Sequence, residues 1–124
     1  MNRSELLRLF ILDDIADDYE EIEHITGNVT ALAQKCGLTV SSGEVREELM
    51  NLIDAGFAKA YRFTGRHLPE DIRGRPLPEE LEETATGYVY FWITESGREL
   101  HGSRDDWWPF DDDDSLRIDW SLTD

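Results

Sequence analysis

The sequence is poor in cysteine and has no long apolar run. Its single Cys36 excludes a disulfide within the chain and fits the reducing cytoplasm. No stretch reaches the ~18 consecutive apolar residues that a transmembrane helix needs. The apolar stretch near the N-terminus is followed by acids and lacks a small-residue cleavage site, so we expect no signal peptide. These absences predict a cytoplasmic protein.

Basic residues are also scarce. Lysines and arginines number 12 against 28 aspartates and glutamates, which gives a net charge of −16. A field of this sign repels phosphate backbones and anionic membrane surfaces. One segment is the exception, because it holds only Glu70 and Asp71 against five bases: Lys59, Arg62, Arg66, Arg73 and Arg75. We therefore expect a basic loop at 62–75 on an acidic protein.

Two acidic patterns invite a metal interpretation. Glu20 and His24 stand at i and i+4 of a predicted helix, a spacing that can hold a metal. No second histidine or cysteine lies nearby, so a helical ion pair is favoured. The run Asp111–Asp114 fails as a calcium loop, because Leu116 stands where glycine is required and Leu122 where a glutamate belongs. We expect no metal and no other cofactor.

Catalytic motifs are similarly missing. Cys36 lies near the end of a predicted helix, where the helix dipole disfavours a thiolate, so a structural role is expected. The three histidines have no serine or cysteine motif around them: His24, His67 and His101. We expect a protein that is not an enzyme.

The apolar pattern predicts three helices in one domain of 124 residues. Ser4 is the expected N-cap of the first, over 4–15, and its pattern continues to a break at Gly27 and Asn28. A short helix over 29–37 should stop at Gly37. A Ser-x-x-Glu capping box predicts a helix over 41–55, whose apolar stripe is Val45, Leu49, Leu52 and Ile53.

Strands are expected at 58–63 and 88–94. The segment 64–87 between them reads as irregular, with Pro78 starting one short helical turn. A short helical turn or two should follow within TESGRELHG, residues 94–102. The order of these elements predicts an α+β protein.

Two stretches resemble a winged helix-turn-helix domain. VSSGEVREELMNLIDAGFAKAYRF is similar to its third helix and first wing strand. YVYFWITESGREL resembles the second wing strand, with the Thr-x-x-Gly-Arg step of bacterial regulators of the PadR and MarR type. The resemblance implies a winged-helix domain at 1–101, with a long wing loop at 64–87, and an acidic aromatic extension at 102–124.

The resemblance also implies a mode of action. In that family the third helix enters the major groove and the wing contacts the backbone. The candidate nucleic-acid-binding residues are then Ser41, Ser42, Arg46, Arg62, Arg66, Arg73 and Arg75. Glu44, Glu47 and Glu48 on the same helix would oppose phosphates. We therefore expect a non-catalytic regulatory protein that contacts a protein partner or a second copy of itself, with transcriptional regulation through DNA as the alternative.

The C-terminal extension carries three of the four tryptophans. Val89, Phe91 and Ile93 should face the helices, which leaves an aromatic stripe of Tyr88, Tyr90 and Trp92 on the other face of the strand. We expect the extension to cover this stripe, within one chain or across a dimer, with four residues: Trp107, Trp108, Phe110 and Trp120.

Two further expectations concern the same extension. Its residues 116–122 alternate as a strand would, after an exposed bend at Asp111–Asp114. A second hypothesis places this bend beside Arg66 to Arg75, on the surface that DNA would use, as an electrostatic self-block or a dimer contact.

Overall fold

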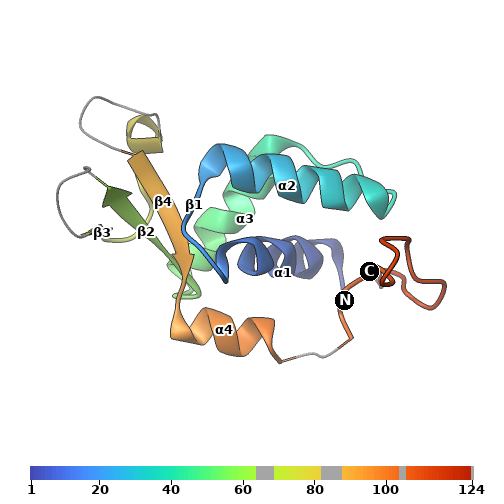
Figure 1. Ribbon diagram of the computed structural model, residues 1–124. Coiled ribbons are helices and arrows are strands. Elements are labelled where there is room, and N and C mark those ends of the chain that lie inside the picture. Colours follow the sequence, from blue (N-terminus) through green and yellow to red (C-terminus); the bar gives the residue numbers. More distant parts are fainter. Residues whose placement is uncertain (64–68, 82–87, 104–105, 124) are drawn as a thin grey trace.

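The computed structural model describes residues 1–63, 69–81, 88–103 and 106–123. Its elements confirm the prediction of an α+β protein (Figure 1). The helices are α1 Arg3–Ile15, α2 Ile22–Lys35, α3 Ser42–Asp54, the 3-10 turn η1 Pro78–Leu81, and α4 Glu95–His101. The strands are β1 Glu20–Glu21, β2 Ala58–Phe63, β3 Glu70–Ile72 and β4 Tyr88–Ile93.

The strands form one antiparallel sheet in the order β1-β4-β2-β3. The sheet stands at one end of the molecule, and α1 extends from it between α4 and the pair α2 and α3 (Figure 1). Ala60 opposes Phe91 in the central pair of strands. Three helices followed by an antiparallel strand pair are compatible with a winged-helix-like fold.

The core is centred on α1. The sequence predicted one apolar face on this helix, but seven of its 13 residues are buried: Leu6, Leu7, Leu9, Phe10, Ile11, Leu12 and Ile15. The predicted stripe of α3 and the inward face of β4 are both confirmed, since every one of their residues is buried. The helical layer therefore closes around α1, with β4 at one end.

The boundaries of the first two helices differ from the prediction. Asn2, and not Ser4, caps α1, because its side chain accepts a hydrogen bond from the Glu5 amide at 2.9 Å. Helix α2 runs through Gly27 and Asn28 without a break. Glycine inside a helix costs about 1 kcal/mol. Burial of the α2 stripe outweighs this cost, and the Asn28 amide donates to Asp14 Oδ1 at 2.6 Å.

The connection between β2 and β4 is more regular than predicted. The helical turn at Pro78 is confirmed as η1. Strand β3 was missed, and it pairs with β2 through Tyr61 and Asp71. A strand of three residues is too short to show a periodic pattern in the sequence.

The Thr-x-x-Gly-Arg step joins β4 to α4 and locks both onto the helices. Thr94 accepts from the Gly97 amide at 3.0 Å and donates to the Gly56 carbonyl at 2.6 Å. Arg98 then donates to the Ala16 carbonyl at 2.8 Å, at the end of α1. Gly97 lies so close to Phe57 that an added Cβ would sit 2.1 Å from its carbonyl oxygen.

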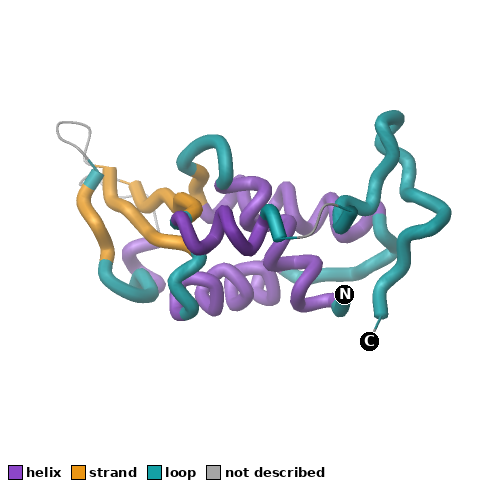
Figure 2. Tube along the Cα trace, turned by 90° about the horizontal axis from the view of Figure 1, so that it is seen from below, coloured by secondary structure: helices purple, strands orange, loops and turns teal. Residues whose placement is uncertain are grey.

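The C-terminal extension does not pack on the sheet of its own chain, so the expectation is wrong for docking within one chain. It lies at the opposite end of the helical layer, beside the N-terminus (Figures 1 and 2). The rings of Trp107, Trp108 and Phe110 surround Phe10 of α1, with centroid distances of 5.8, 5.7 and 6.5 Å. The N-terminal amine donates to Thr123 Oγ1 at 2.8 Å.

The expected strand at 116–122 is also absent from the described residues. Within 106–123 the chain forms turns and a single bridge between Phe110 and Leu116. Alternation in the sequence does not suffice here, because a strand needs a neighbour to pair with. The exposed bend at Asp111–Asp114 is confirmed, and Asp114 takes a left-handed φ of 65°.

Replacing Trp107 with alanine should destabilise the protein by about 3–5 kcal/mol, because a buried indole leaves a cavity. Ile118→Ala is the control, since this side chain is fully exposed and its loss should leave stability unchanged. Urea unfolding of both variants measures the difference. Equal midpoints would show that the extension does not contribute to the core.

Replacing Gly97 with alanine should lower the melting temperature, because the new methyl group meets the Phe57 backbone. Gly43→Ala is the matched control, since its nearest neighbour would be Ser41 Oγ at 3.8 Å. Alanine is the better helix former, so this control should melt at or above the wild-type temperature. Thermal unfolding followed by circular dichroism compares them, and tolerance of both changes would contradict the packing.

Candidate interaction surfaces

Two glutamates of α3, Glu44 and Glu48, bind residues of α1. Glu44 accepts from the Nε and Nη2 atoms of Arg3 at 2.7 and 2.8 Å. Glu48 accepts from Ser4 Oγ at 2.7 Å and Arg8 Nε at 2.9 Å. The bonds from Arg3 hold the pKa of Glu44 below its ordinary value. The expectation that Glu44 and Glu48 face DNA is therefore wrong, because both are engaged with α1.

The opposite edge of α3 is bound by Arg75 from the loop after β3. Its guanidinium donates to Asp54 Oδ2 at 2.8 Å, Glu47 Oε1 at 3.2 Å and Asn51 Oδ1 at 3.1 Å. These contacts lower the pKa of Asp54, chiefly through the hydrogen bond. Arg75 thus ties its loop to the helix that the resemblance assigns to the major groove.

The other basic candidates are also paired within the chain. Arg46 contacts Glu23 at 3.2 Å, and Arg62 contacts Glu80 at 2.6 Å. Lys59 contacts Asp71 at 2.6 Å. The sequence places only two acids within this segment. In the folded chain, Glu80 and acids of α3 also pair with its arginines. The expected basic loop is largely neutralised where the structure describes it.

Three of the remaining nucleic-acid candidates lie in the part of the chain that the structure describes, and Arg73 is the one cation among them. Ser41 and Ser42 are exposed at the start of α3, where Ser41 Oγ accepts from the Glu44 amide at 3.1 Å. Arg73 is exposed beyond β3. Arg66 lies outside the described residues, as does His67.

The aromatic face of the sheet is partly covered from within the fold, while Tyr88 stays 40% exposed. Tyr19, which links α1 to β1, stacks on Trp92 at 4.7 Å. Phe63 packs against Tyr90 at 4.9 Å, and Tyr90 lies 6.1 Å from Tyr88. Sequence reasoning missed this cover because it placed Tyr19 inside a continuing helix. Tyr88, Tyr90 and Trp92 therefore belong to a different cluster from the tryptophans of the extension.

Residues 110–119, hereafter the acidic loop, are held in a defined shape. Arg117 donates to the carbonyls of Asp106 and Trp108 at 2.9 and 2.7 Å and also binds Asp119. Trp120 Nε1 donates to the Trp107 carbonyl at 3.1 Å. The bend is closed by a hydrogen bond from the Asp111 amide to the Ser115 carbonyl at 2.8 Å and by the bridge between Phe110 and Leu116.

The acidic loop presents apolar side chains to solvent. Ile118 is fully exposed and Leu116 is 41% exposed. The five aspartates of the loop are exposed around them: Asp111, Asp112, Asp113, Asp114 and Asp119. Sequence reasoning assigned Ile118 to a buried strand face, and no signal in the sequence distinguishes that position from an exposed turn.

Within one chain, this bend does not lie beside the described part of the basic segment, so the self-block is contradicted there. The acidic loop and β3 stand at opposite ends of the molecule (Figure 1). Asp111–Asp114 therefore do not screen the described part of the basic segment, whose Arg75 is bound to α3 instead.

Two acids lie beside His24, but Glu20 stands in β1 and outside α2, so the contact is not the helical pair that the sequence predicted. His24 Nε2 lies 3.5 Å from Glu20 and 3.4 Å from Asp14. Burial raises the pKa of Asp14. Among the described residues, no group of three histidines, cysteines or acids is arranged to hold a metal. In the same residues, no helix is long and apolar enough to cross a membrane.

The chain matches no model of a known protein family, no curated protein and no solved structure. The interpretation of its surfaces therefore depends on the residues themselves.

Cys36 should react slowly with a thiol reagent at pH 8, because burial raises the pKa of its thiol to about 11. The same chain unfolded in guanidinium should react much faster. Absorbance of the released thiolate follows both reactions. Equal rates in the folded and unfolded chains would contradict the partly buried position of Cys36.

Proposed function

We propose that the protein is a small, non-catalytic regulatory module of the winged-helix type, resident in the cytoplasm, that acts by binding another protein. Its contact surface is the acidic loop. The observation that carries this proposal is the full exposure of Ile118 between two residues that are bonded to each other, Arg117 and Asp119.

The loop has the physical properties of a binding surface. Covering an isoleucine side chain contributes about 1.5–3 kcal/mol. Because Arg117 already orders the backbone, a partner would pay little conformational entropy on binding. The surrounding aspartates speed encounter with a basic surface and disfavour acidic ones. The partner is therefore expected to carry an apolar pocket bordered by lysine or arginine.

DNA-binding transcriptional regulation is the second candidate. The order of helices and strands favours it, and so do the exposed Ser41 and Ser42 at the start of α3, where backbone amides can approach phosphate. The engagement of Arg46, Arg62 and Arg75 with acids of the chain opposes it. Net charge adds to this opposition.

Ile118→Ser should abolish the capture of specific partners by the immobilised protein, because it removes the apolar anchor and leaves every loop hydrogen bond in place. Leu77→Ser is the matched control, since Leu77 is also exposed but lies in the loop before η1. Quantitative mass spectrometry of proteins retained from a lysate of the source cells compares the three baits.

Two results decide between the candidates. Identical retained sets with all three baits would contradict a role for the acidic loop. Retardation of mixed DNA fragments by the wild-type protein at low salt, reduced by Arg73→Ala, would favour the second candidate. We expect no retardation.

A further inference from the structure

The end of α1 leads into a segment that is crowded with negative charge. Seven of the eleven residues from 13 to 23 are acids: Asp13, Asp14, Asp17, Asp18, Glu20, Glu21 and Glu23. No basic residue stands in the last turn of α1, where the helix dipole is also negative. The charge of this segment is therefore relieved by groups from other elements, by water or by protons.

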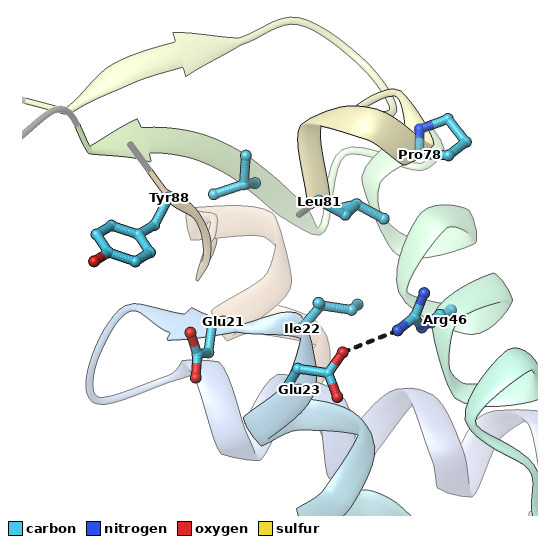
Figure 3. A pocket seen from close by; sticks show the side chains of 8 residues that line it. Glu21, Ile22, Glu23, Arg46, Pro78, Leu81 and Tyr88 are labelled. Carbon is cyan, nitrogen blue, oxygen red and sulfur yellow. Dashed lines mark hydrogen bonds and ion pairs between the residues drawn. The ribbon is translucent and has the colours of Figure 1, made fainter. Parts of the chain in front are cut away.

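Basic side chains of α3 and α4 face this segment. Arg98 of α4 donates to the backbone carbonyl of the α1 C-cap at 2.8 Å. His101 of the same helix lies 3.0 Å from Asp13 Oδ1. Arg46 of α3 contacts Glu23 at 3.2 Å, as the dashed line in Figure 3 shows, and both residues line one cleft.

Asp14 is held between α1 and α2 with little access to water. Its side chain is 7% exposed. The Oδ1 atom accepts from Asn28 at 2.6 Å and lies 3.4 Å from His24 Nε2. The Oδ2 atom is buried and has no hydrogen-bond partner among the described residues. The charged form of this carboxyl is therefore costly, because a buried oxygen lacks a donor.

His24 connects the buried carboxyl to solvent and to β1. Its side chain is 50% exposed, and its Nε2 atom also lies 3.5 Å from Glu20 Oε2. A proton can therefore reach Asp14 through an exposed ring. On the imidazole the proton creates an ion pair with both acids, and on Asp14 it removes the buried charge. In either place it lowers the electrostatic cost, so the pair titrates as a unit.

The direction of the pH dependence follows from the burial of the two acids. Burial raises the pKa of Asp14 above its ordinary value, and it raises the pKa of Glu20 in the same way. The folded chain therefore holds these protons more strongly than the unfolded chain does. The charged carboxyls destabilise the fold at neutral pH, and this destabilisation is relieved as the pH falls through the raised values.

We propose that Asp14, Glu20 and His24 form a proton-binding latch, which fastens α1, β1 and α2 to one another in mild acid and loosens them as the pH rises. The latch encloses the turn that carries Tyr19, whose ring stacks on Trp92 at 4.7 Å. Uptake of one proton thus secures this ring over the aromatic face of the sheet. The latch lies outside the acidic loop and does not depend on the proposed function.

Asp14→Asn tests the latch, because asparagine resembles the protonated carboxyl and keeps an oxygen for Asn28. At pH 8 the variant should melt roughly 2–5 °C above the wild-type protein. The wild-type protein should gain a similar amount between pH 8 and pH 5.5, and the variant should gain less than half of it. Asp112→Asn is the matched control, since it removes one exposed charge and should shift the melting temperature by less than about 1 °C.

The indole Nε1–Hε1 resonance of Trp92 in the 15N-labelled full-length protein reports the joint locally, and Trp92→Phe assigns it. This resonance should move between pH 8 and pH 5.5 in the wild-type protein. Asp14→Asn should keep it near its acid position at both values. His24→Gln should shift the midpoint of the change to lower pH, because Asp14 then binds the proton alone.

Three results would overturn the proposal. One is a folded Asp14→Asn variant that melts at or below the wild-type temperature at pH 8. Another is an equal gain in melting temperature in this variant and in the wild-type protein. A third is a Trp92 resonance that does not change with pH, or whose midpoint His24→Gln leaves in place. The wild-type resonance and His24→Gln suffice if Asp14→Asn does not fold.

Discussion

The fold depends on one constraint, which is that α1 must be covered on nearly every side. Seven of its 13 residues are buried, too many for a helix with one wet face. Helices α2, α3 and α4, strand β4 and the C-terminal extension each cover part of it. Phe10 shows the principle, because three aromatic rings from the far end of the chain surround it. This common dependence makes the extension a part of the core.

The distribution of charge follows from the same packing. The side chains of Arg3 and Arg8 extend from α1 and bind glutamates of α3. Arg75 binds the other edge of α3. Much of the scarce basic charge is thus used to fasten helices and loops together. Most exposed charged residues of the acidic loop are therefore acids. Ile118 and Leu116 are exposed among them, on a backbone that Arg117 holds by hydrogen bonds. This distribution of charge is why we propose a basic protein partner in preference to a nucleic acid.

Local signals were reliable where one interaction decides the conformation. Ser41 caps α3 as its spacing predicted, and Gly37 adopts the positive φ that ends α2. The alternation of β4 also predicted its buried face. Prediction failed where a distant neighbour decides. Gly27 stays helical because the α2 stripe is buried, and Tyr19 covers the sheet because α1 ends before it.

The sequence by itself determined the class of the fold, the capped helix, the central strands and the need to bury the tryptophans of the extension. Only the tertiary structure decided where those tryptophans go, because the aromatic face of the sheet and Phe10 are equally apolar in the sequence. It likewise decided that Arg46 faces a cleft and that Arg75 binds α3. Charge pairs and burial partners depend on which surfaces meet in space, and residue spacing along the chain carries no record of that.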